Sequence, residues 1–280
     1  MKWGSFQLHL LSAGVFRLDG GAMFGVVPKP LWERVATPDA RNRIPLGLNC
    51  LLIRTGDVNV LVDTGCGRKY SPKEIEIYSI DVSADLVREL AKIGLDPEEI
   101  DIVVNTHLHF DHCGGNTFVA GEDVVPTFPG AEYVVRKVEY QDASAPNERT
   151  RATYFAHNWS PIEAAGKLRV IDQDWEIVPG VTCISTPGHT LGHQSVFVES
   201  EGRKLLFLAD LCPTMAHVPL PYVMGYDLFP LTTLKTRKEI YPRAVEENWE
   251  LIFEHDPVHP YGRLLKKNGR YAAERLQWAE

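Results

Sequence analysis

The sequence predicts an α/β fold in which two mixed sheets pack face to face and helices cover both outer faces. Each half of the chain supplies several short strand-like runs with flanking helical stretches, and such layers bury one apolar sheet face against another. The chain has no fixed-period repeat, low-complexity tract or composition break that would mark a linker. We therefore expect a single domain over residues 1–280.

Strands come first along the chain. Apolar runs predict strands at residues 8–18, 48–53 and 58–62, and the turn Thr55-Gly56-Asp57 joins the last two as a hairpin. Between the first two strands lies an arm at residues 20–45 that contains Pro and Arg. Connections of this length are usually functional or take part in an interaction.

Helices and a further strand follow. Ser83 is expected to cap a helix that Gly94 ends, because apolar residues recur at i, i+4 and i+7 between positions 86 and 93. Residues 96–99 have the pattern of a capping box with Pro at the first helical position, and lead into a strand at residues 101–105.

The second half repeats this order. Strands are expected at residues 133–135, 168–171, 182–185, 195–199, 204–208 and 250–253. The segment 136–166 is predicted to be helical and rich in loops. A helix over residues 233–248 should bend at Pro242, and Asn268-Gly269 predicts a hairpin turn near the end.

Composition excludes several classes of protein. A formal net charge of −8 argues against a nucleic-acid partner, and the apolar runs are far shorter than the ~20 residues that cross a bilayer. The first residues lack the apolar stretch and cleavage site of a signal peptide. We therefore expect a cytoplasmic protein without a membrane partner.

The five cysteines include no C-x-x-C pair and are expected to be reduced packing residues.

A cluster of histidines follows the predicted strand 101–105. His107, His109, Asp111 and His112 fall within six positions. On an extended strand end His107 and His109 point to one side and can share one metal ion, whereas Asp111 and His112 lie where the chain turns and can face a second. Imidazole and carboxylate donors suit Zn, Fe, Mn or Co, and the lack of thiolate ligands favours a catalytic site over a structural zinc site.

Three further candidates lie after later strands. His189 stands in a Pro-Gly turn, and Asp210 and His255 each follow a buried apolar run. A carboxylate at such a position costs several kcal/mol, roughly, unless it is paired or metal-bound, which favours a ligand role for Asp210.

These motifs resemble the metallo-β-lactamase superfamily of hydrolases. The resemblance rests on Thr-His-Leu-His-Phe-Asp-His-Cys-Gly-Gly at 106–115, Thr-Pro-Gly-His-Thr-x-Gly-His-Gln-Ser at 186–195, Asp210 and the late His255, and it covers nearly the whole chain. It implies an αββα sandwich with the metal ions in a groove at the sheet edges. It also implies that one metal ion is held by His107, His109 and His189, the other by Asp111, His112 and His255, and that Asp210 bridges both. We expect two divalent metal ions, with zinc preferred and iron, manganese or cobalt as alternatives.

Two more residues match supporting positions of the family. Asp63 lies in a Val-Asp-Thr-Gly turn and would support the ligand loop from behind, the alternative being a local Asx turn. His193 would form hydrogen bonds behind the ligands.

The expected reaction is hydrolysis. Two metal ions would hold a bridging hydroxide and polarise an acyl or phosphoryl oxygen, and Asp111 would be the catalytic residue that takes a proton from the water and passes it to the leaving group. A lactonase or carboxylic-ester hydrolase is the first choice. The alternatives are an organophosphate (phosphotriester) hydrolase and an acyl-glutathione thioesterase. From another class, a mononuclear iron dioxygenase on the same fold would use only some of the seven ligands.

The substrate is expected to be a small molecule bound by an apolar wall. The arm at 20–45 resembles one that, in the lactonase and organophosphate groups, shapes either the pocket or the interface of a homodimer. The known acyl-homoserine lactonases carry a tyrosine three residues after the bridging Asp, where this chain has Pro213. Tyr222 or Tyr226 could substitute, the alternative being that both are ordinary pocket-wall or packing aromatics. The wall candidates are Met23, Phe24, Tyr154, Phe155, Trp159, Tyr222 and Tyr226.

Overall fold

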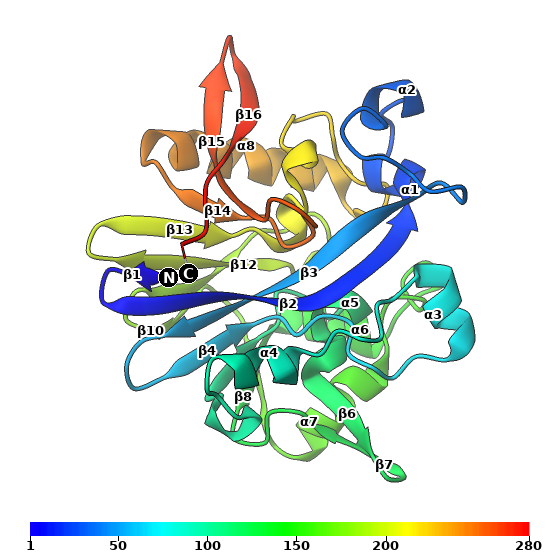
Figure 1. The fold of residues 1–280 in the computed structure, drawn as a ribbon, viewed down its shortest axis with the longest axis vertical. Coiled ribbons are helices and arrows are strands. Elements are labelled where there is room, and N and C mark those ends of the chain that lie inside the picture. Colours follow the sequence, from blue (N-terminus) through cyan, green and yellow to red (C-terminus); the bar gives the residue numbers. More distant parts are fainter. Residues whose placement is uncertain (280) are drawn as a thin grey trace. The chain divides into compact units, whose positions relative to one another are not determined.

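The computed structural model describes residues 1–279, which divide into two compact units. The first unit comprises residues 1–14 and 48–174, and the second comprises residues 15–47 and 175–279. Each unit contains one seven-stranded sheet with parallel and antiparallel pairs (Figure 1). The expected α/β class with two large mixed sheets is confirmed.

The first sheet has the strand order β1-β2-β3-β4-β5-β8-β9. Its strands are β1 (Lys2–Trp3), β2 (Phe6–Asp19), β3 (Arg43–Arg54), β4 (Asn59–Val62), β5 (Ile102–Val104), β8 (Glu132–Arg136) and β9 (Leu168–Ile171). The pairs β4·β5, β5·β8 and β8·β9 are parallel, so these strands end at the same edge. A separate hairpin is formed by β6 (Thr117–Ala120) and β7 (Asp123–Pro126).

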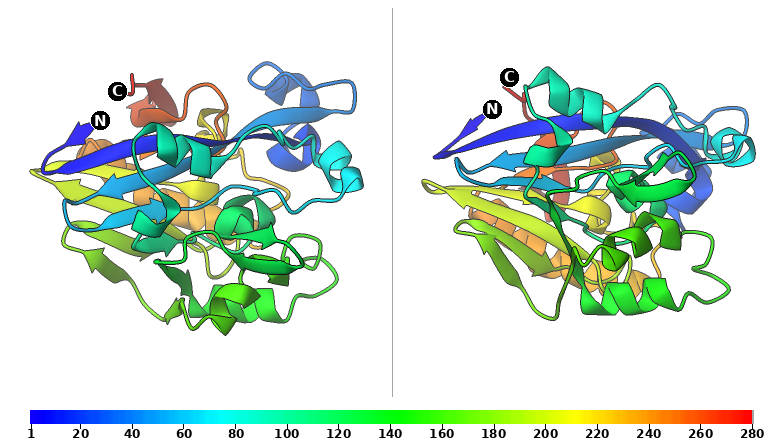
Figure 2. Two further views of the ribbon diagram at one scale, coloured as in Figure 1. Left: turned by 60° about the horizontal axis from the view of Figure 1, so that its bottom comes forward. Right: turned by 90° about the horizontal axis from the view of Figure 1, so that it is seen from below.

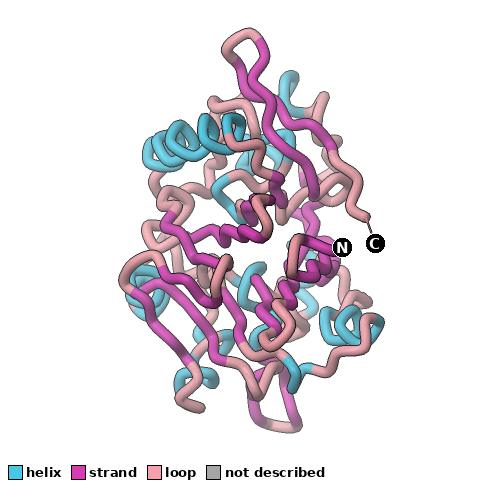
Figure 3. Tube along the Cα trace, turned by 90° about the vertical axis from the view of Figure 1, so that its left-hand side faces the viewer, coloured by secondary structure: helices cyan, strands magenta, loops and turns pink. Residues whose placement is uncertain are grey.

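The second sheet has the order β10-β11-β12-β13-β14-β15-β16. Its strands are β10 (Trp175–Val178), β11 (Val181–Ser185), β12 (Gln194–Ser200), β13 (Arg203–Phe207), β14 (Glu250–Ile252), β15 (Tyr261–Lys267) and β16 (Arg270–Arg275). Only β13 and β14 are parallel in this sheet. The hairpin of β15 and β16, red in Figure 1 and at the top of Figure 3, turns at Asn268-Gly269 as predicted, with both residues at positive φ.

Each unit also contains helices (Figures 1 and 2). In the first unit they are α3 (Pro72–Tyr78), α4 (Leu86–Lys92), α5 (Phe110–Cys113), α6 (Lys137–Ser144) and α7 (Ser160–Ala164), with the 3-10 turns η1 (Pro97–Glu99), η2 (Gly114–Asn116) and η3 (Ala156–Asn158). The second unit has α1 (Gly20–Phe24), α2 (Lys29–Trp32), η4 (Ala209–Leu211), η5 (Met215–His217) and α8 (Pro230–Glu246). Leu86 and Leu90 of α4 pack on strand residues of the first sheet, and Ile240 and Tyr241 of α8 pack on the second.

Several predicted boundaries are wrong. Ser83 does not cap α4, because its hydroxyl donates to Asp81 while the Asp85 side chain accepts from the Val87 N–H. The arm at 20–45 contains α1 and α2 and ends inside β3. The helix expected at 233 begins at Pro230, which suits the first helical position. Within residues 1–279, no helix has the length and apolar character needed to cross a membrane.

Candidate metal centre

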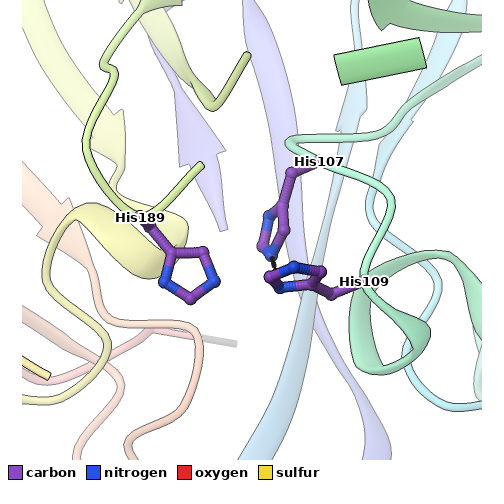
Figure 4. A group of neighbouring side chains, drawn as sticks. All are labelled: His107, His109 and His189. Atoms are coloured by element: carbon purple, nitrogen blue, oxygen red, sulfur yellow. Dashed lines mark hydrogen bonds between the residues drawn. The ribbon is translucent and has the colours of Figure 1, made fainter. Parts of the chain in front are cut away.

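In the first unit, the His107–His112 run leaves the end of β5 and enters α5. All four of its candidate ligands are buried, with His107 and His112 fully so. The His107 Nε2 lies 3.1 Å from the His109 Nδ1, and Figure 4 draws this contact as a dashed line. The His112 Nε2 is 3.8 Å from an Asp111 carboxylate oxygen.

Asp63 fixes this run from behind. Its carboxylate accepts hydrogen bonds from the Thr106 N–H (2.8 Å), the Thr106 hydroxyl (2.7 Å) and the His112 Nδ1 (3.0 Å). Because the Thr106 hydroxyl donates to Asp63, its oxygen is left to accept from the His107 Nδ1 at 3.1 Å. Both histidines are therefore held with the proton on Nδ1 and the lone pair on Nε2.

Backbone contacts also hold this run in place. A Cβ added at Gly114 would lie 1.9 Å from the Cys66 carbonyl oxygen, and one at Gly115 would lie 2.2 Å from the Thr64 carbonyl oxygen. The Thr64 N–H donates to the His112 carbonyl at 2.8 Å. The two loops thus touch backbone to backbone, and a side chain does not fit between them.

In the second unit, Asp210 and two histidines form a second buried group. Asp210 lies in η4, directly after β13. One of its carboxylate oxygens is 3.0 Å from the His189 Nε2, and the other is 3.3 Å from the His255 Nε2. Figure 4 shows the His189 ring on the turn that follows β11. Asp210 therefore presents each of its two oxygens to a different imidazole.

These two histidines are also held by Nδ1. The His255 Nδ1 donates to the Gly47 carbonyl at 2.8 Å, and the His189 Nδ1 faces the Asp227 carboxylate at 2.9 Å. Neither partner can donate a proton, so both Nδ1 atoms carry one. In the neutral rings, each Nε2 lone pair then faces an Asp210 oxygen, which is repulsive unless a proton or a cation lies between them. A hydrogen bond from Nδ1 to a carboxylate or backbone carbonyl is usual for histidines that bind metal ions through Nε2.

The electrostatics of His189 agree with this arrangement. Burial opposes the charged ring, but the carboxylates of Asp210 and Asp227 outweigh it and raise the pKa of His189 to about 10. The two acidic neighbours thus demand a positive charge at this position, which a proton or a metal ion can supply.

The donor set fits divalent metal ions of the zinc type. Two ligands bound at about 2.1 Å in a tetrahedral site lie roughly 3.4 Å apart, close to the 3.1, 3.0 and 3.3 Å separations found here. All of these donors are nitrogen or oxygen. The five cysteines are buried free thiols, and burial raises the pKa of Cys113 to about 12, which suits a packing role for this neighbour of the ligand run.

His193 lies behind Asp210. Its Nδ1 contacts the Thr186 carbonyl (3.0 Å) and hydroxyl (2.9 Å), and its Nε2 accepts the Asp210 N–H at 3.2 Å. Both ring nitrogens are engaged by protein groups, so His193 orients the Asp210 backbone.

The wall candidates lie in different surroundings. Tyr154 packs its ring 4.9 Å from His109, and the half-buried Phe155 lies 5.8 Å from Phe110, measured between ring centroids. Trp159 is buried against Tyr140. Tyr222 and Tyr226 are partly exposed.

Met23 and Phe24 of the arm have almost no exposed surface. Phe24 is stacked between Trp32 (5.3 Å) and His217 (4.5 Å). In this structure, therefore, these two arm residues support neighbouring loops and do not present a surface to a ligand.

Sequence reasoning missed two supporting carboxylates. Asp227, the partner of His189, is buried. In the sequence it stands between the apolar residues Tyr226 and Leu228, and this was the available signal that its carboxylate has a partner. Glu139 of α6 accepts from the Leu108 N–H and the Tyr154 hydroxyl, both at 2.9 Å. No local pattern marks Glu139, because its partners are brought to it only by the fold.

Buried imidazole and carboxylate donors at strand ends define a hydrolase-type metal site on a mixed α/β scaffold. Residues 43–257 match the family described as the metallo-beta-lactamase superfamily. The chain belongs to this superfamily, and the predicted relationship is confirmed.

Individual relatives agree. The chain is 28% identical over 264 residues to the N-acyl homoserine lactonase AiiA of Bacillus thuringiensis subsp. kurstaki, covering 89% of this chain and 93% of the relative. The structure of a probable metal-dependent hydrolase from Staphylococcus aureus matches with a TM-score of 0.91 and 32% identity, with both chains fully covered. An N-acyl homoserine lactone hydrolase with N-hexanoyl-L-homoserine at its metal centre matches with a TM-score of 0.68 and 26% identity over 89% of this chain and 93% of the other.

Proposed function

We propose that this protein is a dinuclear metal-dependent hydrolase that opens lactones, with N-acyl homoserine lactones as the leading substrate class. One observation carries the metal site: Asp210 directs its two oxygens at the Nε2 atoms of His189 and His255, whose Nδ1 protons are fixed elsewhere. A carboxylate in this position is suited to be shared by two cations.

The proposed ligand sets follow the family's motifs. His107, His109 and His189 hold one metal ion, Asp111, His112 and His255 hold the other, and Asp210 serves both. The superfamily match over residues 43–257 supports these sets because it includes all seven proposed ligands. Zinc is the preferred metal, since imidazole and carboxylate donors suit it. When bound, the ions supply Lewis-acid activation of water and of the substrate carbonyl.

The chain's own residues then manage protons and orientation. Asp111 is nearly buried beside His112, and its carboxylate takes a proton from the attacking water and returns it to the alkoxide that leaves on ring opening. Asp63 and Asp227 keep the Nδ1 protons of His112 and His189 in place, so that each Nε2 stays available.

The substrate proposal rests on the relatives and on the side chains at hand. The lactonase match covers 89% of the chain, and Phe155, Tyr222 and Tyr226 offer partly exposed aromatic surface for an acyl chain. All five cysteines are buried thiols, which is compatible with the cytoplasmic location that we also propose.

Elemental analysis of the purified protein tests the metal centre. We expect two metal equivalents per chain, loss of both in Asp210→Ala, and selective loss of one in His255→Ala. Asp172→Ala removes an exposed carboxylate and should retain two equivalents. One equivalent in the fully active wild-type protein, or two in Asp210→Ala, would contradict the dinuclear assignment.

Comparison of kcat/KM across substrates tests the chemistry. An N-acyl homoserine lactone should exceed a paraoxon-type triester, a β-lactam and lactoylglutathione by at least tenfold, about 1.4 kcal/mol in transition-state binding. A triester or thioester that wins by this margin would reassign the enzyme. Metal-dependent oxygen consumption without hydrolysis would identify a dioxygenase.

A further inference from the structure

Arg237 of α8 is a fully buried cation. Its guanidinium donates from Nε to the Leu211 carbonyl at 2.6 Å, and from Nη1 to the His217 carbonyl at 3.0 Å and the Tyr222 carbonyl at 2.9 Å. Among residues 1–279 its hydrogen-bond partners are backbone carbonyls, and no carboxylate forms an ion pair with it.

Burying a guanidinium costs its hydration, and here the three carbonyls and the more distant carboxylates of Asp210 and Asp227 offset that loss, so that the pKa of Arg237 is raised. An apolar side chain in its place would leave the three carbonyls without this donor. Arginine offers several donors in a rigid planar arrangement, which can fix several acceptors at once.

The three carbonyls that Arg237 binds belong to one loop, residues 210–227. The ends of this loop are Asp210 and Asp227, which contact the two nitrogens of His189 at 3.0 and 2.9 Å. The loop therefore closes around the His189 ring with one carboxylate on each side. Arg237 binds it next to its first residue and at two points in its middle.

The same loop is joined to the arm. The His217 Nε2 contacts the Met23 carbonyl at 2.9 Å, and the Gly225 N–H donates to the Ala22 carbonyl at 2.8 Å. A Cβ on Gly25 would lie 2.4 Å from the Val223 carbonyl oxygen. Holding the loop therefore also holds the arm segment that packs on it.

We propose that Arg237 is a positioning residue of the metal site. By fixing three carbonyls of the 210–227 loop, it sets the separation of the Asp210 and Asp227 carboxylates around His189 and the placement of Tyr222. The effect on metal binding rests on the proposed function, whereas the effect on the loop does not.

The test compares Arg237→Met and Arg237→Lys with Arg243→Met. Arg243 lies on the same helix but is largely exposed, with its Nε 3.7 Å from Glu247. Hydrogen exchange of the metal-free proteins, followed by mass spectrometry, should be at least tenfold faster in residues 211–225 of Arg237→Met and unchanged in β12 and β13. Arg237→Lys should fall between this variant and wild type, and Arg243→Met should match wild type.

Zinc titration provides the second measurement. Arg237→Met should bind zinc at least tenfold more weakly. In Arg237→Ala, which leaves room for the ligand, millimolar methylguanidinium should restore part of the affinity, which a loss of packing alone would not allow. Wild-type exchange and zinc affinity in Arg237→Met would overturn the proposal. So would faster exchange throughout the second sheet in Arg237→Met and Arg237→Lys, because Arg237 would then support the fold as a whole. A wild-type protein that opens no lactone would overturn the proposed substrate. It would not affect the conclusion drawn from hydrogen exchange in residues 211–225.

Discussion

His217 should make the stability of this protein depend on pH. It is fully buried, its Nδ1 contacts the Thr214 hydroxyl at 2.7 Å, and its Nε2 contacts the Met23 carbonyl at 2.9 Å. Burial, only partly opposed by the bond to Met23 and reinforced by the positive charge of Arg237, lowers the pKa of His217 from 6.5 to about 3. The folded protein therefore keeps a neutral ring at pH values where the unfolded chain is protonated.

The sign follows from proton linkage. Between pH 6.5 and pH 3 the unfolded state binds more protons at this residue, so the stability present above pH 6.5 is lost as the pH falls. With these two pKa values, the loss between pH 8 and pH 5 is about 2 kcal/mol. In His217→Gln, an amide that does not titrate replaces the imidazole, and this contribution disappears.

Urea unfolding of both proteins at pH 5, 6, 7 and 8 measures the effect. The free energy of unfolding of the wild type should fall by about 2 kcal/mol more between pH 8 and pH 5 than that of His217→Gln. Other titrating groups are common to both proteins and cancel in this comparison. Equal pH dependence in the two proteins would refute a neutral buried His217.

Three further substitutions test the contacts around the site. Asp227→Asn should weaken metal binding about 10- to 100-fold, measured by competition with a chromophoric chelator; unchanged affinity would show that His189 does not need this partner. Glu139→Ala leaves the Leu108 N–H without its acceptor and should lower the free energy of unfolding by about 1–3 kcal/mol, whereas an unchanged urea midpoint would contradict this. Phe24→Ala removes the middle ring of the arm stack and should cost about 3–5 kcal/mol or release the arm to limited proteolysis, so a resistant and equally stable variant would contradict the packing described.

The candidate ligands were predictable because they lie close together in the sequence or follow recognisable strands. His107, His109, Asp111 and His112 form one short run, and Asp210 follows an apolar strand. For these residues, local spacing and the loss of free energy on burying an unpaired charge were sufficient signals. The hairpin turn at Asn268-Gly269 was predictable for a similar reason, since two adjacent residues at positive φ favour Asn and Gly.

The supporting residues were not predictable from local patterns. Glu139 contacts Leu108 from 31 positions away, and Asp227 contacts His189 from 38. The cap of α4 was misplaced because Ser83 and Asp85 are both good capping residues, and Asp81 engages the Ser83 hydroxyl. The packing of the arm could not be predicted from the sequence, because the rings of Trp32 and His217 come together on either side of Phe24 only in the folded chain.

The backbone contact between the loops at 64–67 and 112–115 bears on how mutational scans of this protein should be interpreted. Every side chain larger than hydrogen at Gly114 or Gly115 meets a carbonyl oxygen at 2.2 Å or less. These positions will therefore score as inactive in a screen for activity, as the proposed metal ligands will. At these glycines the loss of activity comes from the lack of room for a side chain and not from the loss of a group that takes part in the reaction. A proposed ligand such as His112 should tolerate alanine as a folded protein without activity, whereas Gly114→Ala should lose soluble protein as well. Measuring the amount of soluble protein together with activity will therefore distinguish residues proposed to bind metal from glycines that are needed only because a side chain does not fit.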